Sequence, residues 1–321
     1  MGTGRLREFR QIGPRGARGP RGTAAQRAGG GGPGAEQRGG RARARGGGTA
    51  GNPGATSRAP RPAPPPPQVG TDSSGAYLRG CLEERGVGLA GLRVAEGPSG
   101  TAIVLLERAT RENRIVIVGG ANTAGAGLDD AQLRLIEGAG MVLLQREVPG
   151  ETNLAAARAA RAARVPVLMD AGGEDAPLPD ELLALLDTFS PNETELARIS
   201  GMPAGDEAQA EAAARALLAR GAQRVLVKRG TRGSLLVDAG GVTRCGVVPA
   251  ARVVDTTGAG DSFTAGYAVA TLEGRAPADA MLFGAAVASL VVGRMGAMSS
   301  LPSRAEVDAL LASGTRGVAP A

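Results

Sequence analysis

One run of the chain, DTTGAGDSFTAGY over Asp255–Tyr267, has the residue types and the spacing that phosphoryl transfer needs. The segment Arg252–Val254 before it has the pattern of a short β-strand, and the end of the run is apolar at helical spacing. Gly258 and Gly260 permit backbone angles that side chains forbid. The free amides at such a helix start, together with the helix dipole, attract a phosphate group. Asp261 stands at that point and could accept a proton from an attacking hydroxyl.

Three other polar segments stand where a strand or a helix begins or ends. Asn192 and Glu195 are three residues apart, which is also the spacing of a capping box. The Gly-containing loop Lys228–Gly233 follows a strand and could equally be a β-turn between two strands. Glu147 follows an apolar strand, so it stands at the carboxyl edge of the sheet, where open α/β folds bind ligands. Asp261 itself is a good N-cap residue, so each candidate also has a purely structural interpretation.

The elements that must position these residues follow from hydrophobic periodicity. Short, continuously apolar runs predict strands, and Ala/Leu-rich runs at helical spacing predict helices. The predicted strands are 101–106, 114–118, 141–144, 165–169, 224–227 and 234–237, with a strand end at 69–72, and the predicted helices are 75–86, 152–163, 207–220, 277–292 and 304–312. The first two full strands suit a hairpin. The later alternation of strands and helices predicts an α/β fold with a mostly parallel central sheet, covered by helices on both faces.

Composition divides the chain near residue 68. Residues 1–68 hold 13 Arg, 18 Gly and two acidic residues, a net charge of +11, and only four large apolar side chains. Such a segment cannot bury a core, so we expect it to be disordered. Residues 69–321 hold 24 basic and 29 acidic residues, a net charge of −5. They are long enough for one domain with a sizeable core, and the basic pI of the chain describes only its tail.

The basic tail leaves several interpretations open. An Arg/Gly-rich tail can bind RNA by charge, but this one lacks interleaved aromatic residues. A transit peptide would also be basic, but Ser57 is the only serine before residue 69. A solvated tail without a role, or the product of a wrong reading frame in GC-rich DNA, fits the excess of Arg, Gly, Pro and Ala equally well. Nucleic acid is therefore not an expected partner.

Residue counts exclude several kinds of site and setting. No apolar run reaches the roughly 18 residues that span a bilayer, so we expect no membrane partner. Cys81 and Cys245 are far apart and lack a metal-ligand pattern, and the chain has no histidine. A reduced, cytoplasmic setting fits this composition, with plastid or nucleus as alternatives.

The glycine run resembles the signature of the ribokinase family, the PfkB-type carbohydrate kinases. A second segment, Pro191–Glu195, resembles the Asn-x-x-Glu element of the same family. The resemblance extends from Val69 to about Leu311, because family-like segments appear in order at 70–72, 99–102, 120–122, 145–147 and 228–233. It implies a ribokinase-like three-layer αβα sandwich with a small β lid. It also implies transfer of the γ-phosphoryl group of ATP to a sugar hydroxyl. The favoured acceptor is O5 of D-ribose, with fructokinase and nucleoside kinase activity as alternatives.

The resemblance further implies a role for each candidate residue. Asp261 is the catalytic base and contacts the sugar, as does Glu147. ATP brings Mg²⁺, and K⁺ is an activator. The implied anion hole is Gly258, Ala259 and Gly260; the implied ATP-binding residues are Asn192, Glu195, Lys228, Arg229, Gly230, Thr231, Arg232, Gly233 and Gly260; the implied monovalent-cation site is Asp255, Thr257, Val291, Arg294, Gly296 and Ser300. Members of the family are often homodimers through the lid.

Two family elements that bind the sugar are missing from the sequence. A strand with an Asn-x-Asp element and a Gly-Gly-Lys-Gly-Ala-Asn loop belong before Val69, but residues 1–68 contain neither, and Lys228 is the only lysine. We therefore expect the first core strand, part of the lid and the helix after that loop to be absent. An N-terminally incomplete kinase domain could bind nucleotide without turnover, so a pseudokinase stays open beside an active kinase.

Overall fold

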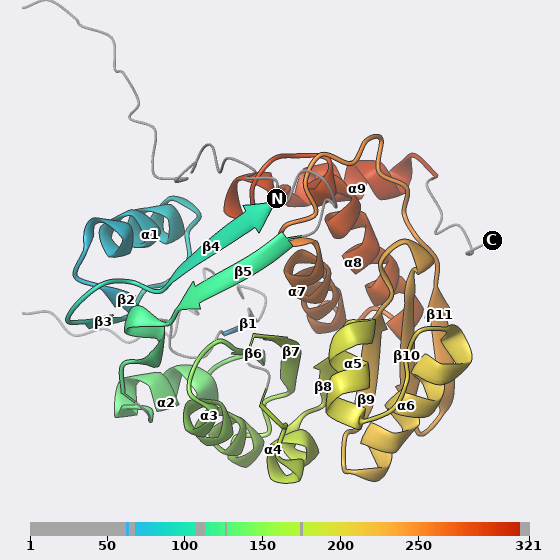
Figure 1. The fold of residues 1–321 in the computed structure, drawn as a ribbon, viewed down its shortest axis with the longest axis horizontal. Helices are drawn as coiled ribbons and strands as arrows, with labels where there is room; N and C mark the ends of the chain where they lie inside the picture. The colour runs from blue at the N-terminus through green and yellow to red at the C-terminus, as the bar shows by residue number, and fades with distance from the viewer. Residues whose placement is uncertain (1–61, 64–67, 107–112, 126, 174–175, 315–321) are drawn as a thin grey trace, which may run out of the picture. The chain divides into compact units, whose positions relative to one another are not determined.

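The computed structural model describes residues 62–63, 68–106, 113–125, 127–173 and 176–314, all of them in one compact unit, Thr56–Ala321. A seven-stranded sheet runs through the described part of this unit (Figure 1). Its strands, in spatial order, are β1 (Pro62–Ala63), β6 (Met141–Arg146), β7 (Val167–Gly173), β8 (Thr188–Ser190), β9 (Arg224–Lys228), β10 (Ser234–Asp238) and β11 (Gly241–Cys245). The five strands from β1 to β9 pair in parallel, whereas β10 is antiparallel to both β9 and β11. The predicted α/β fold with a mostly parallel sheet is confirmed.

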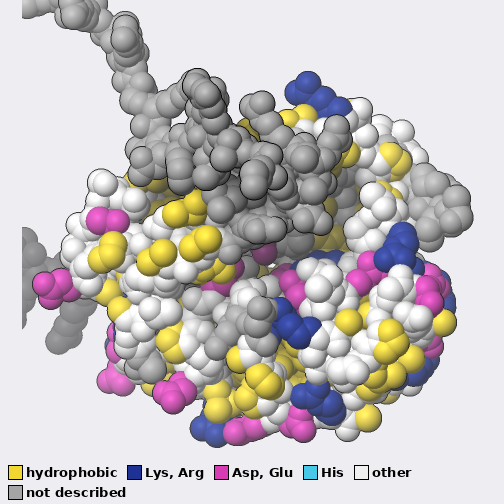
Figure 2. Space-filling view, in the orientation of Figure 1, with side chains coloured by type: hydrophobic (Ala, Val, Ile, Leu, Met, Phe, Trp, Pro, Cys, Tyr) yellow, Lys and Arg dark blue, Asp and Glu magenta, His cyan; other side chains and the backbone are white. Residues whose placement is uncertain are grey.

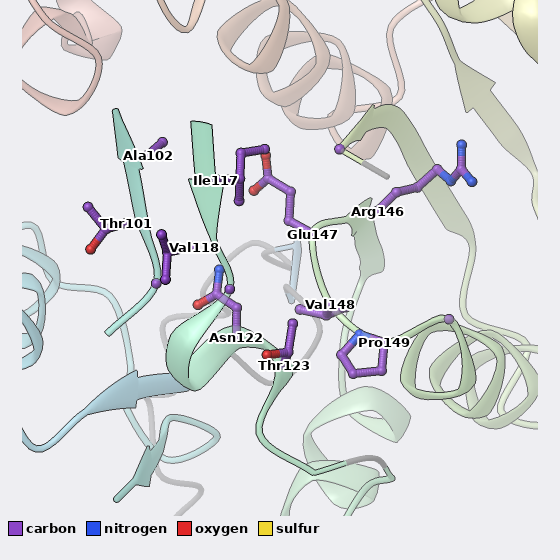
Figure 3. A pocket seen from close by; sticks show the side chains of 14 residues that line it. Thr101, Ala102, Ile117, Val118, Asn122, Thr123, Arg146, Glu147, Val148 and Pro149 are labelled. Carbon is purple, nitrogen blue, oxygen red and sulfur yellow. The ribbon is translucent and has the colours of Figure 1, made fainter. Parts of the chain in front are cut away.

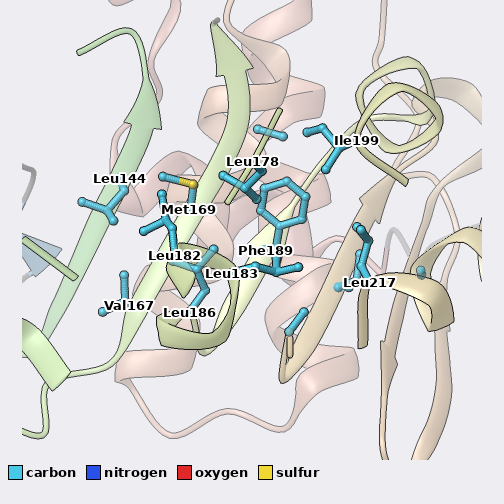
Figure 4. Packing of buried hydrophobic residues seen from close by; sticks show 14 of the residues in the cluster. Leu144, Val167, Met169, Leu178, Leu182, Leu183, Leu186, Phe189, Ile199 and Leu217 are labelled. Atoms are coloured by element: carbon cyan, nitrogen blue, oxygen red, sulfur yellow. The ribbon is translucent and has the colours of Figure 1, made fainter. Parts of the chain in front are cut away.

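Helices cover both faces of this sheet and make three layers. One face carries α2 (Asp130–Glu137), α3 (Gly150–Ala162), α4 (Asp180–Leu185), α5 (Glu193–Ser200) and α6 (Glu207–Ala219), and the other carries α7 (Ala259–Leu272), α8 (Pro277–Val292) and α9 (Arg304–Ala312). Side chains alternate along each strand, so Val167 and Met169 of β7 enter the hydrophobic core on the side of α2–α6 (Figure 4), whereas Leu168 enters the core on the side of α7–α9. The long predicted helices agree with α3, α6, α8 and α9 within two residues.

Two small sheets lie beside the main sheet. The predicted hairpin is present as β4 (Thr101–Leu106) and β5 (Asn113–Val118), paired antiparallel, while β2 (Gln68–Gly70) pairs in parallel with β3 (Arg93–Ala95). Helix α1 (Ser73–Glu84) follows β2, as the sequence predicts, and the short helix η1 (Gly120–Thr123) follows β5. Hydrophobic side chains gather on the surface over this region (Figure 2). The exposed ones of the hairpin are Ile103, Val116, Ile117 and Val118.

Two expectations about strands need correction. Arg252–Val254 forms no strand, because the amide groups of Val254 and Asp255 donate to the carbonyl of Val292 at the end of α8 and no strand lies alongside. In the segment expected to be disordered, Pro62–Ala63 pairs with Met141 and Val142 of β6. Such pairing uses only backbone groups, and an edge strand tolerates proline. A strand of two residues thus lies where we expected the first core strand to be absent.

No helix among the described residues is long and apolar enough to cross a membrane.

Candidate active site

The glycine run forms the start of helix α7. Gly258 is its N-cap and has left-handed backbone angles, φ 75° and ψ 4°, which favour glycine. The first N–H groups of a helix lack intrahelical partners. Of these, the amide of Ala259 donates to the carbonyl of Thr256 at 3.2 Å. The amides of the following residues and the positive end of the helix dipole make this turn suitable for an anion.

Asp261 stands in the first turn of α7 and is exposed to solvent. The side-chain amide of Gln145, at the end of β6, donates to Asp261 Oδ1 at 3.3 Å. The surrounding protein still removes part of the water from the carboxyl, which raises the pKa of Asp261. The charge of Asp170 raises this pKa further, while the charge of Lys228 lowers it. Asp261 is thus not an N-cap, which is the simpler interpretation of an Asp at a helix start.

A buried polar cluster lies beside the first turn of α7, and most of its residues were not predicted from the sequence. Asp170, in the middle of β7, is 4% exposed. Its Oδ2 accepts hydrogen bonds from Lys228 Nζ at 2.5 Å and from Thr264 Oγ1 at 2.6 Å. The hydroxyls of Thr264 and Ser190 lie 3.2 Å apart. In the sequence, Asp170 directly follows the predicted strand 165–169. An acidic residue at such a position is a candidate for the carboxyl edge of the sheet, by the same reasoning that identified Glu147.

Asn192 and Glu195 form the capping box of α5. The side chain of Asn192 accepts from the Glu195 amide at 2.8 Å, and Glu195 Oε2 accepts from the Asn192 amide at 2.7 Å. The capping interpretation is therefore correct, yet it uses only one oxygen of Glu195. Burial raises the pKa of Glu195, while the hydrogen bond from the Asn192 amide and the charge of Lys228 lower it. The nearby charges of Asp170 and Asp261 raise it, so this carboxyl belongs to the same electrostatic cluster.

The loop Lys228–Gly233 has the geometry of a tight connection between β9 and β10. It contains the short helix η2 (Gly230–Arg232), and the Arg229 amide donates to the Gly233 carbonyl at 2.9 Å. The alternative interpretation as a turn is thus correct. The guanidinium of Arg229 is buried and forms ion pairs with Glu193 at 3.3 Å and Glu207 at 2.9 Å. That of Arg232 pairs with Glu193 at 2.6 Å, whereas Thr231 is exposed at the tip. The two arginines therefore tie the loop to α5 and α6.

Glu147 lies at an open hollow of about 430 Å³ between the β4–β5 hairpin and the end of β6 (Figure 3). Asn122 and Thr123 of η1 line the same hollow, whereas the side chain of Arg146 points away from its centre. Partial burial raises the pKa of Glu147, and the charges of Asp261 and Asp170 raise it further. Asn122 belongs to the family-like segment 120–122, for which the sequence predicted no role. The hollow, Glu147 and Asp261 therefore belong to one site.

The residues expected to bind a monovalent cation lie in the loop before α7, at the end of α8 and in the segment after α8 that ends in a short helix. Asp255 accepts hydrogen bonds from the amides of Thr257 and Gly296, each at 2.9 Å. The pKa of Asp255 is lowered, most by the side chain of Thr257 and further by these two amide bonds. The backbone amide of Arg294 donates to the carbonyl of Val291 at 3.1 Å. The guanidinium of Arg294 donates to the carbonyl of Ser300 at 3.4 Å, and Ser300 ends the short helix η3 (Met298–Ser300).

The donor set of these loops suits a hard monovalent cation, because it consists of one carboxylate, carbonyl groups and hydroxyl groups. Among the described residues, no three His, Cys, Asp or Glu side chains group as a metal cage. These oxygen ligands, most of them backbone carbonyls, suit a monovalent cation better than a transition metal.

Comparison with known proteins gives the family. Residues 68–304 match the model described as pfkB family carbohydrate kinase. The chain is 43% identical over 250 residues to a ribokinase of Arabidopsis thaliana, a match that covers 76% of this chain and 66% of that protein. A ribokinase of Haemophilus influenzae is 31% identical over 243 residues, covering 74% of this chain and 78% of its own length.

Solved structures agree with the sequence matches. The structure of Arabidopsis thaliana ribokinase complexed with ribose and ATP superposes with a TM-score of 0.73, covering 76% of this chain and 80% of that chain. The ribokinase of Thermotoga maritima superposes with a TM-score of 0.67 at 34% identity, again covering 76% and 80%. The glycine turn with Asp261 and the capping pair Asn192 and Glu195 both lie within the matched residues. The chain therefore belongs to the pfkB family of carbohydrate kinases.

Proposed function

We propose that this chain is an ATP-dependent sugar kinase that transfers the γ-phosphoryl group of ATP to D-ribose, giving ribose 5-phosphate and ADP. The observation that carries the proposal is the 3.3 Å hydrogen bond from Gln145 Nε2 to Asp261 Oδ1. This contact joins the end of β6, where Glu147 lines the hollow, to the phosphate-binding turn of α7. A carboxylate between a sugar-sized hollow and an anion site is the arrangement that a kinase base needs.

In this proposal, Asp261 accepts the proton of the attacking sugar hydroxyl. Its raised pKa supports the role, because a base whose pKa lies closer to the working pH accepts protons more effectively. The N–H groups of the Gly258, Ala259 and Gly260 turn stabilise charge on the transferred phosphoryl group. Asn192 and Glu195 would hold the Mg²⁺ that arrives with ATP and neutralises phosphate charge, and the loop 228–233 would lie along the nucleotide. No covalent intermediate on the enzyme is needed.

Ribose is the proposed sugar because the Arabidopsis relative was solved with ribose and ATP and is 43% identical to this chain over the matched residues. Glu147, Asn122 and Thr123 offer polar groups in the hollow, and the neighbouring hairpin contributes apolar side chains. A mainly apolar hollow with few polar groups is typical of a small-molecule site.

Three further features belong to the same proposal. K⁺ is the proposed activator at Asp255 and Gly296, because a cation there would polarise the adjoining anion hole. The exposed apolar hairpin, with Ile117 at 65% exposure, supports a homodimer through the lid. The composition favours a cytoplasmic setting. Light scattering at several concentrations tests the dimer, and replacing KCl by NaCl in the assay tests the activator.

The central experiment is a coupled assay of ADP release by the full chain with MgATP, with and without D-ribose, fructose or a nucleoside. We expect ribose-dependent turnover that falls about 10²- to 10⁴-fold in Asp261→Asn, while MgATP binding by calorimetry persists. If fructose or a nucleoside is the preferred acceptor, and its turnover falls in Asp261→Asn by the same factor, the chain is a kinase for that acceptor and not for ribose. MgATP binding without turnover on any acceptor would refute the kinase proposal in favour of a nucleotide-binding pseudokinase.

A further inference from the structure

The only lysine of the chain forms a buried ion pair beside the proposed phosphate site. Lys228 ends β9, and its side chain is 12% exposed, while that of Asp170 is 5% exposed. Lys228 Nζ donates to Asp170 Oδ2 at 2.5 Å and to Thr264 Oγ1 at 3.5 Å. The family resemblance places Lys228 in the nucleotide loop and implies no role for Asp170 or Thr264. The structure instead directs the ammonium away from the loop and towards β7 and α7.

Asp170 is well suited to hold this ammonium in place. Its Oδ2 also accepts from Thr264 Oγ1 at 2.6 Å, and its Oδ1 accepts from the Gly172 amide at 3.1 Å. These bonds fix the carboxylate to both β7 and α7. A buried ion pair adds little stability compared with apolar side chains of the same volume, because both charges lose their hydration. Stability alone therefore gives no good reason for a lysine and an aspartate at these positions.

The position of the ammonium suggests what the pair does. A Cβ atom built on Gly260 would lie 3.6 Å from Lys228 Nζ, so the ammonium lies against the first turn of α7. Thr264 is one helical turn after Gly260 and shares that helix face. Among the described residues, Asp170 and Thr264 are the two acceptors bonded to Nζ, and an ammonium has three N–H donors. One donor and the positive charge thus remain for a ligand at the turn.

We propose that Lys228 supplies a positive charge and one N–H donor to the terminal phosphate bound at the 258–260 turn, and that Asp170 and Thr264 are positioning residues that hold its ammonium there. The inference rests on the proposed function only in taking this turn as the phosphate site. An ammonium fixed before the ligand arrives costs no reorganisation when charge develops on the phosphoryl group. Because the charge acts on the terminal phosphate, it favours ATP over ADP.

The experiment measures the affinities of MgATP and MgADP by calorimetry in the full chain, with melting temperature as a check on folding. The variants are Lys228→Met, Lys228→Arg, Asp170→Asn and the double variant with Asp170→Asn and Lys228→Met. Removing only the lysine leaves a buried carboxylate without its charge partner, which can unfold the protein. The double variant removes both charges with little change of shape and keeps the test valid. Ser234→Ala is the control, because that buried hydroxyl lies opposite Lys228 in the sheet and has no hydrogen-bond partner in the described structure.

We expect Lys228→Met and the double variant to weaken MgATP binding by about tenfold to a hundredfold, the loss of one hydrogen bond to a charged group. MgADP should change less than about threefold, Lys228→Arg should restore part of the preference for ATP, and Asp170→Asn should reduce that preference without removing it. Ser234→Ala should match the wild type. Equal weakening of both nucleotides, or an unchanged preference in the double variant, would overturn the inference.

Failure of the proposed function gives a different result. A wild-type chain that binds MgATP but never releases ADP with a sugar contradicts the kinase proposal, and the affinity ratio still tests Lys228. A wild-type chain that binds neither nucleotide overturns both.

Discussion

The two glycines at the start of α7 should respond in opposite ways to the same substitution. Gly258 has a φ of 75°, and a Cβ there would meet nothing closer than Ala297 at 3.6 Å. Gly260 lies inside the helix with ordinary angles, and its Cβ would meet Lys228 atoms at 3.6 to 4.0 Å. Neither methyl group clashes with a neighbour. The backbone conformation therefore decides the effect on stability, and the position of Lys228 decides the effect on binding.

The magnitudes follow from these two environments. An alanine in the left-handed region costs roughly 1–2 kcal/mol, and the reduced entropy of the unfolded chain returns about 0.4–1 kcal/mol. Gly258→Ala should thus destabilise the protein by about 1 kcal/mol. Gly260→Ala should stabilise it by up to about 1 kcal/mol, because alanine is the better helix former. For a folded part of this size, 1 kcal/mol corresponds to about 2–4 °C in Tm.

The assay is thermal unfolding of both variants beside the wild type, followed by MgATP titration. We expect Gly258→Ala to melt about 2–4 °C lower and Gly260→Ala to melt no lower than the wild type. Despite its stability, Gly260→Ala should bind MgATP about tenfold more weakly, because its methyl group covers the open side of the ammonium. A Gly260→Ala protein that melts well below the wild type would refute the packing argument. One that binds MgATP normally would refute the placement of the phosphate beside Lys228.

Three further predictions concern charged side chains outside the glycine turn. Hydrogen bonds from the Ser303 backbone, followed by the pair with Arg294, lower the pKa of Glu306 from 4.5 to about 2. The stability that Glu306 adds is therefore present above pH 4.5 and lost as the pH falls through 2, so urea unfolding should distinguish Glu306→Gln at pH 7 but not below pH 2. Arg229→Met should lower the free energy of unfolding by about 1–3 kcal/mol in urea titrations, since it removes the buried guanidinium that bridges Glu193 and Glu207, whose other ion pairs, with Arg232 and Arg244, remain; unchanged stability would contradict this. Asp255→Asn should remove activation by K⁺ in the ADP-release assay, and persistent activation would place the cation elsewhere.

Local sequence predicted most of the fold because helices and parallel strands depend on hydrophobic periodicity. The runs 207–220 and 277–292 became α6 and α8 almost without change, since both bury an apolar face that recurs at helical spacing. The strand predicted at Arg252–Val254 was wrong, because three β-branched or long residues can equally form an extended loop. Here the end of α8 takes their hydrogen bonds, and Val253 is 69% exposed.

Most of the candidate site was also visible in the sequence. Asp261 and its glycines were identifiable because neighbouring residues make a helix start, and the proposed anion site depends on the local backbone alone. The same locality explains why Asn192 and Glu195 cap α5 as their spacing predicts. For the arginines of the loop 228–233, local sequence could not indicate their partners, because Glu193 and Glu207 come from helices that only the packed sheet brings near.

The sequence by itself determined the family, the order of the elements and the position of the glycine turn proposed to bind phosphate, because each depends on residues close together in the chain. Only the tertiary structure decided which distant groups meet at that turn. Gln145 reaches Asp261 across 116 residues, and Asp170 reaches Thr264 across 94. The physical reason is that parallel strands end at one edge of the sheet, so residues far apart in sequence share one small volume there. Their charges then act on each other, as the pKa of Asp261 shows by responding to both Asp170 and Lys228.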